Sequence, residues 1–281
     1  MTSPYNYYLN LLGNSGVKDS TLIPRVKFLA DFTTNINQLT KKNIIERLNR
    51  SSNPGTRWKN LMHVEAALKE AGIESPIDKE LRDAMYQASF DNTRDTSKNK
   101  KQVDRFQPLE ELQKTLIDRL NESGPTQELM MLAVYVLQPA IRNDWYDMKI
   151  TTKLADAKTG GNWLHVRKTK LTLIMQEYKN DKNMGKVMIP ITNELTPWLN
   201  RWIKGRERVF DINNDNSFGK ALSRASQRVF GQPLTINDFR HIWEIAIQTD
   251  PSYATKTAAE KDSIHRMLLH STEAAMLYNV V

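Results

Sequence analysis

The sequence contains no cysteine, which excludes disulfide bonds, cysteine-based zinc sites and a thiol nucleophile. It has no apolar run close to the roughly 18 residues that a membrane-spanning helix needs. Its first residues, MTSPYNYYLNLLGNSG, have neither the basic start nor the small-residue cleavage site of a signal peptide. These absences favour a soluble intracellular protein that has no membrane partner.

Several common site signatures are missing as well. The sequence has no glycine-rich phosphate loop of the Walker or dinucleotide type and no Gly-x-Ser-x-Gly motif. The histidines at positions 63, 165, 241, 265 and 270 show no metal-ligand spacing, and no acidic cluster is suited to Mg²⁺. His265 and His270 are five residues apart and share a helix face poorly. We therefore expect neither a metal nor a cofactor.

What is present is an ordinary globular composition with an excess of positive charge. The 281 residues are enough for two domains, and 40 Lys and Arg against 32 Asp and Glu give a formal net charge of +8. Such an excess favours an anionic partner, of which nucleic acid is the commonest.

The charge is concentrated towards the first third of the chain, where a basic stretch follows a helical region. Helical patterns in 22–32, 41–50, 54–72 and after Pro76 predict a small all-α domain over 1–92. Residues 93–106 are polar and predict a basic linker, although a solvated surface loop explains them about equally well. Its basic residues, which we expect to bind the phosphates of DNA, are Arg94, Lys98, Lys100, Lys101 and Arg105.

The remaining residues, 107–281, predict a second domain that is mainly α-helical with a small antiparallel sheet. Two helices are expected over 109–124 and 126–142, the second of them buried because it is nearly all apolar. Short runs rich in β-formers at 162–169, 171–178 and 186–191 indicate three antiparallel strands. Helical patterns return after Asn193, with starts near Ser217, Thr235, Thr257 and Ser271.

Basic and polar residues at the ends of these expected elements are the candidates for chemistry. Arg142 closes the apolar helix, Lys179 lies in the polar turn after the second strand, and Arg240 follows Asn237 by three residues on one helix face. Near the end of the chain, His270 is followed eight residues later by Tyr278. Taken singly, each has an ordinary structural explanation, such as an ion pair, a solvated turn or a packing residue.

In this order the residues resemble the catalytic domain of the tyrosine recombinases, or phage-type integrases, which share their catalytic constellation with type IB topoisomerases. LLHSTEAAMLY resembles the Leu-Gly-His-Ser…Tyr ending of the family, and DFRHIWEIA resembles its Leu-Arg-His-Thr-Phe-Ala segment. EYKNDKNMGKVMIPI resembles its lysine-bearing strand pair, and the N-terminal helices are similar to its core-binding domain. The resemblance covers nearly the whole chain.

The resemblance implies a site-specific DNA recombinase or integrase of a virus or other mobile element, acting as a homo-tetramer on double-stranded DNA. It implies that Tyr278 attacks the phosphate to give a 3′-phosphotyrosyl intermediate, and that Lys179 protonates the leaving 5′ oxygen. Arg142, Arg240 and His270 would stabilise the phosphorane charge, for which the planar fork of arginine is well suited. Neither ATP nor a metal is needed for this chemistry.

Two departures from the family pattern leave alternatives open. Asn237 stands where the family usually has His, and an amide cannot carry a proton. The interval from His270 to Tyr278 is eight residues, where nine is more usual. A type IB topoisomerase-like enzyme and a catalytically dead DNA-binding protein of the same fold are therefore the alternative interpretations.

Overall fold

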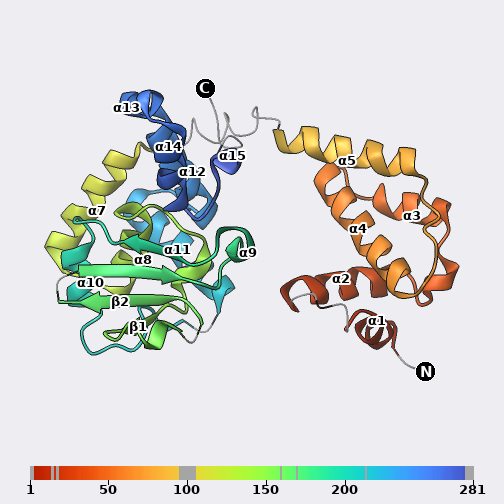
Figure 1. The fold of residues 1–281 in the computed structure, drawn as a ribbon, viewed down its shortest axis with the longest axis horizontal. Coiled ribbons are helices and arrows are strands. Elements are labelled where there is room, and N and C mark those ends of the chain that lie inside the picture. Colours follow the sequence, from red (N-terminus) through yellow and green to blue (C-terminus); the bar gives the residue numbers. More distant parts are fainter. Residues whose placement is uncertain are drawn as a thin grey trace. The chain divides into compact units, whose positions relative to one another are not determined.

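The structure is a computed structural model that describes residues 3–13, 16, 19–94, 106–158, 160–168, 170–212 and 214–275. The chain divides into two compact units, 1–95 and 96–281. The fold is mainly α-helical with one small sheet in the second unit, which confirms the predicted fold class (Figure 1). None of the helices in the described parts of the chain is long and apolar enough to cross a membrane.

The first unit is all helical. Its elements are α1 (Pro4–Leu12), α2 (Asp19–Phe32), the 3₁₀ helix η1 (Ile36–Gln38), α3 (Lys41–Leu48), α4 (Pro54–Glu70) and α5 (Lys79–Arg94). Helix α4 is the centre of the unit, since it packs against α1, α2, α3 and α5. Thr40 caps α3, which begins where the helix over 41–50 is predicted, and its side chain accepts from the backbone N–H of Asn43.

Helix α1 was not predicted, although it has a clear start signal. The Ser3 side chain accepts from the N–H of Asn6, and Pro4 occupies the first helical turn. At the other end of the unit, α5 extends two residues beyond the boundary predicted at 92, so Arg94 is its last residue. Lys98, Lys100, Lys101 and Arg105 of the predicted linker lie outside the described residues.

The second unit carries the sheet and the remaining helices. Its helices are α7 (Leu109–Ser123), α8 (Gln127–Val136), α9 (Asp181–Met184), α10 (Thr196–Trp202), α11 (Asp215–Phe230), α12 (Ile236–Thr249), α13 (Pro251–Thr255), α14 (Ala258–Arg266) and α15 (Thr272–Ala275). Two 3₁₀ helices, η2 (Asn143–Trp145) and η3 (Asp156–Lys158), lie between α8 and the second strand. The strands are β1 (Lys149–Thr151), β2 (Trp163–Arg167), β3 (Lys170–Met175) and β4 (Val187–Pro190).

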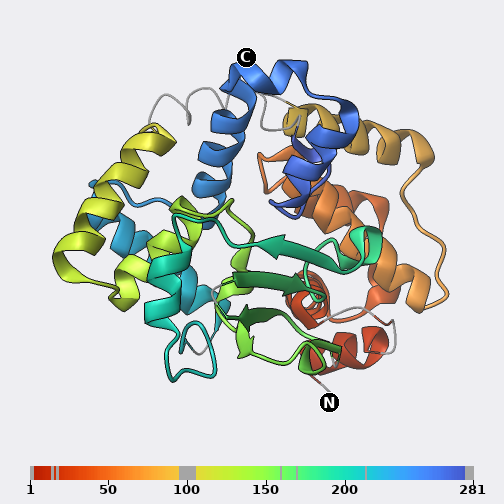
Figure 2. The same cartoon turned by 60° about the vertical axis from the view of Figure 1, so that its left-hand side comes forward.

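The sheet has the order β1-β2-β3-β4 and differs in one respect from the prediction. The three predicted strands are present and antiparallel, with Leu164 opposite Leu173 and Leu173 opposite Ile189. An additional short strand, β1, pairs in parallel with β2, so the sheet is mixed rather than purely antiparallel. β1 was missed because three residues are too short to show an alternating pattern. Figure 2 shows the four strands side by side.

Helix α8 is the buried centre of this unit, as its apolar sequence predicts. Residues 129–136 are all buried, and α8 packs against α7, α10, α11 and α12. The helix ends at Val136, earlier than the predicted residue 142, because Pro139 cannot continue a helical hydrogen-bond ladder. Arg142 therefore does not close this helix but lies six residues beyond it, in extended backbone before η2.

Candidate active site

Arg240 connects two distant segments of the second unit. It lies on α12, whose start is fixed by the predicted cap Thr235, and its side chain is 0% exposed. Its Nη1 donates to the carbonyl oxygens of Ala140 at 2.9 Å and of Leu268 at 2.8 Å. The segment that leads to Arg142 and the segment that leads to His270 are therefore joined by one buried guanidinium group.

Arg142 is held in place through its backbone. The hydroxyl of Tyr135 donates to the Arg142 carbonyl at 2.9 Å, and the indole N–H of Trp243 donates to the Tyr135 carbonyl at 2.8 Å. The side chain is partly buried, and its Nε has no hydrogen-bond partner among the described residues. An unsatisfied buried donor of this kind costs about 1–3 kcal/mol. An anion bound here would supply the missing acceptor.

Lys179 lies in the same region, in the connection between β3 and α9. The positive charge of Arg142 lowers the pKa of Lys179, and partial burial and the charge of Arg240 lower it further. The neighbouring Asn180 donates from Nδ2 to the Leu269 carbonyl at 3.2 Å, so this connection is tied to the segment before His270. Three cations from three separate segments therefore act on one another electrostatically.

An acidic residue that the sequence did not single out accompanies these cations. Burial raises the pKa of Asp144 to about 6, and the charge of Asp147 adds to this. The charges of Arg240 and Arg142 act in the opposite direction and lower it. Asp144 follows Arg142 by two residues, and Asp or Glu is too common near arginine for that spacing to be a useful signal.

His270 is placed by an unusual turn after α14. Leu269, which precedes it, has φ 56°, a left-handed conformation that is uncommon for residues other than glycine. The resembled Leu-Gly-His-Ser segment has glycine at this position. The Nε2 atom of His270 lies 2.7 Å from Oε1 of Glu244, and its Nδ1 lies 3.1 Å from the Ser271 carbonyl oxygen.

Of the two remaining predicted catalytic residues, one is exposed and the other is not described by the structure. Asn237 is exposed in the first turn of α12, one turn before the buried Arg240. Tyr278 lies outside the described residues, which end at 275. Two other tyrosines in polar sequence surroundings are buried. Burial raises the pKa of Tyr8 to about 12, and the Tyr178 hydroxyl donates to the Gly185 carbonyl at 2.6 Å.

Sequence spacing missed a cluster of two histidines and a glutamate. Glu244, His265 and His270 are all buried, and their potential ligand atoms lie within 4.8 Å of one another. Oε1 of Glu244 already lies 3.1 Å from Nδ1 of His265 and 2.7 Å from Nε2 of His270. Ligands of a tetrahedral zinc ion lie roughly 3.3 Å apart. The shorter separations suit shared protons better than a shared metal ion.

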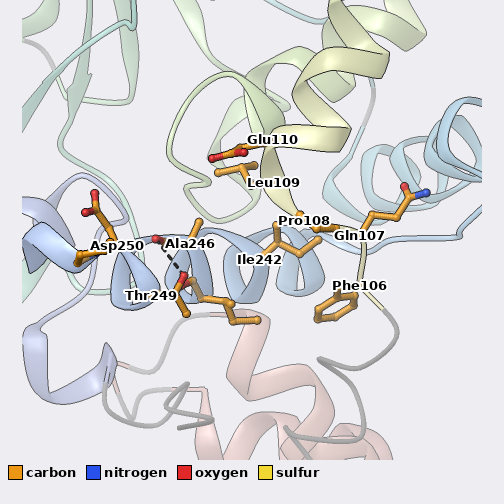
Figure 3. Close-up of a pocket in the computed structure, with 11 residues that line it drawn as sticks. Phe106, Gln107, Pro108, Leu109, Glu110, Ile242, Ala246, Thr249 and Asp250 are labelled. Atoms are coloured by element: carbon orange, nitrogen blue, oxygen red, sulfur yellow. Dashed lines mark hydrogen bonds between the residues drawn. The ribbon is translucent and has the colours of Figure 1, made fainter.

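A separate cavity of about 660 Å³ lies between the start of α7 and the second half of α12. Figure 3 shows its lining, which includes Phe106, Leu109, Ile242 and Ala246. None of the predicted catalytic residues that the structure describes lines this cavity. The cationic group formed by Arg142, Lys179 and Arg240 is therefore a different place in the unit.

Comparisons with known proteins show a distant likeness to solved structures. No protein-family model matches the chain, and no curated protein matches it. The fold is similar to a solved structure described as the crystal structure of XerA recombinase, with 11% sequence identity and a TM-score of 0.39. The match covers 99% of this chain and 93% of that chain. At this sequence identity and TM-score, the likeness is a distant similarity of fold.

Proposed function

We propose that the protein is a DNA strand-exchange enzyme that cleaves and rejoins DNA through a phosphotyrosyl intermediate, with Tyr278 as the nucleophile. The observation that supports this most is the convergence of Arg142, Lys179 and Arg240. The buried guanidinium group of Arg240 donates hydrogen bonds to two backbone carbonyls, and these bonds bring the segments of Arg142 and His270 together. The charges of both arginines also lower the pKa of Lys179, which supports a site in which the three cations act together.

This cationic group suits the chemistry of a phosphodiester. Phosphoryl transfer concentrates negative charge on the non-bridging oxygens, and fixed cationic donors stabilise that charge in a partly dry site. Arg142 has a donor to offer, because its buried Nε has no partner in the described part of the chain. A lowered pKa makes Lys179 a better proton donor to a leaving oxygen, since less free energy is needed to release its proton.

The remaining parts of the proposal follow from the resemblance. The enzyme would act as a homo-tetramer on double-stranded DNA and would serve a virus or another mobile element. Relaxation of a supercoiled plasmid without ATP or Mg²⁺, and without recombinant products, would instead favour the topoisomerase-like alternative. Binding of DNA with no covalent product would favour the catalytically dead alternative.

The test is covalent capture on a nicked duplex that loses a short 5′ fragment after cleavage. The substrate is a pool of duplexes with a randomised core, together with duplexes from the DNA that flanks the gene. We expect a protein–DNA adduct on a denaturing gel that maps to the peptide after Arg266. Tyr278→Phe should abolish the adduct and retain DNA binding, because only the attacking oxygen is removed.

Tyr86→Phe provides the matched control, since Tyr86 is an exposed tyrosine of the first unit. This variant should form the adduct at the rate of the unaltered protein. An adduct on another residue, or an undiminished adduct with Tyr278→Phe, would refute the proposal.

A further inference from the structure

The buried group around Glu244 has features that a packing role alone does not require. Glu244 follows Arg240 by four residues on α12, so both lie on the same face of the helix. Both of its carboxylate oxygens have partners. Oε1 lies near His265 and His270, and Oε2 accepts from Nε2 of Gln248 at 3.2 Å. Its side chain is 0% exposed.

The charge of Glu244 is retained in spite of this burial. Desolvation raises the pKa of the carboxyl, but hydrogen bonds from His265 and His270 outweigh it and lower the pKa to about 2. The group is therefore a carboxylate at all ordinary pH values. A buried carboxylate needs a compensating positive charge nearby, because an unpaired one is expensive to desolvate.

The atoms that face the ring nitrogens indicate which histidine supplies that charge. Nδ1 of His270 faces a backbone carbonyl and Nε2 faces the carboxylate, and both of these partners can only accept. Each ring nitrogen of His270 therefore needs a hydrogen. His265 differs, because its Nε2 lies 2.7 Å from the hydroxyl of Tyr253, which can donate. His265 can donate from Nδ1 to Glu244 and remain neutral.

We propose that Glu244 is the positioning residue of His270, holding it as an imidazolium ion through Nε2 and leaving Nδ1 to donate to a phosphate oxygen. Only the identity of the anion as a phosphate rests on the proposed function. Among the described residues, the other titratable groups that interact with Glu244 are His241 on α12, His265 on α14 and Tyr253 on α13, and Arg240 lies one turn before Glu244 on α12. Helix α13 packs against α12, and α14 is joined to α12 through the contact of His265 with Glu244 (Figure 1).

This arrangement also links His270 to the arginines. Arg240 holds the carbonyl of Leu268, and Asn180 holds that of Leu269, so the two residues before His270 are fixed to the cationic group. The partner of Nδ1 is the carbonyl of Ser271, a residue that is exposed at the start of α15. A phosphate oxygen can replace that carbonyl while Nε2 stays on Glu244. The resembled Leu-Arg-His-Thr-Phe-Ala segment has alanine in place of Glu244. The contact between a glutamate and His270 is therefore a feature of the present chain.

The first measurement needs no DNA and is made on the unaltered protein, with one variant used only to assign a signal. In protein with ¹⁵N-labelled histidine, long-range ¹H–¹⁵N spectra at pH 7.5 distinguish a doubly protonated ring from a neutral one. We expect two protonated nitrogens for His270, with the signal assigned by its loss in His270→Gln, and one for His265. A neutral His270 would overturn the proposal. So would one equivalent of zinc in the purified protein, measured by elemental analysis, because a metal would then hold these three groups.

The second measurement uses Glu244→Gln, which keeps the shape of the side chain and removes its charge. We expect His270 to become neutral, and the rate of covalent capture to fall by more than about tenfold with little change in DNA binding. Glu244→Asp should restore the imidazolium signal and part of the rate, which a purely structural role does not predict. Glu194→Gln removes an exposed carboxylate of the same unit and is the matched control.

The outcomes separate the two proposals. If the unaltered protein captures no DNA but His270 is doubly protonated and responds to Glu244→Gln, the proposed function fails and the assignment of Glu244 stands. If capture occurs and the His270 signal is the same in Glu244→Gln, the assignment of Glu244 is wrong. The spectrum of the unaltered protein decides the charge state even where a variant does not fold.

Discussion

The two arginines of the cationic group should differ sharply in what they contribute to stability, and alanine substitutions test this. In Arg240→Ala, the carbonyls of Ala140 and Leu268 both lose a charged donor. Hydrogen bonds to charged groups contribute about 1.5–3 kcal/mol each. Two such bonds in a fully buried place predict a loss of about 3–6 kcal/mol in the free energy of unfolding.

Arg142→Ala should cost far less. The Nε of Arg142 has no hydrogen-bond partner in the described residues, and its charge repels Lys179 while it attracts Asp144. Because these effects oppose one another, we expect a change below about 1 kcal/mol, as for most substitutions that break no buried contact. Both variants should be defective in covalent capture.

The assay is urea unfolding followed by tryptophan fluorescence in a Trp58→Phe background. Trp58 is the one tryptophan of residues 1–95, so the remaining five report the second unit alone. This matters because two units that unfold separately give no single free energy of unfolding. If Arg240→Ala costs no more than Arg142→Ala, the assignment of Arg240 as the group that joins the two segments is refuted.

Three further predictions concern Lys179, the predicted linker and the first unit. Lys179→Ala should slow capture by about 10²–10⁴-fold, and a substrate with sulfur as the bridging 5′ atom should restore much of the rate. No restoration would exclude Lys179 as the general acid. Replacing Lys98, Lys100 and Lys101 by Ala should reduce the log–log salt slope of DNA binding by about 0.9 for each phosphate that the protein no longer neutralises, and an unchanged slope would mean a solvated loop. Burial, with smaller effects from Arg25 and Lys59, lowers the pKa of His63 to about 4. Because the unfolded chain then binds the proton more readily, the first unit should lose stability as pH falls from about 6.5 towards 4. An NMR titration of His63 with a midpoint near 6.5 would contradict this.

The sequence predicted what local signals determine. Thr40, Thr235 and Thr257 each cap a helix that begins at the predicted place. A cap of this kind can be predicted because it depends only on a threonine and the backbone N–H three residues after it. The three longer strands were also predicted, because a run of β-forming residues is likewise a property of adjacent residues. Helix α1 was within reach too, since Ser3 and Pro4 are an ordinary helix start.

The sequence could not predict what depends on a turn. His265 and His270 are poorly placed to meet on a continuous helix, but α14 ends at Arg266 and Leu269 turns the backbone with φ 56°. This turn brings the two rings to a centroid separation of 5.5 Å, beside Glu244 of another helix. Hydrophobic periodicity does not indicate that a leucine adopts the left-handed backbone conformation, in which glycine is the usual residue. The cluster was therefore visible only in three dimensions.

The three cations do not support anion binding equally. The fold itself accounts for Arg240, because its buried charge satisfies two carbonyls, and a protein that had lost all activity would keep it for that reason. The fold does not account for Arg142 and Lys179 in the same way. Arg142 holds a buried donor with no acceptor in the described residues, and it lowers the pKa of a neighbouring lysine. Both features oppose stability in the absence of an anion and are reversed when one binds. The proposed phosphate site therefore depends on Arg142 and Lys179, and substitutions of these two residues are the ones that can refute it.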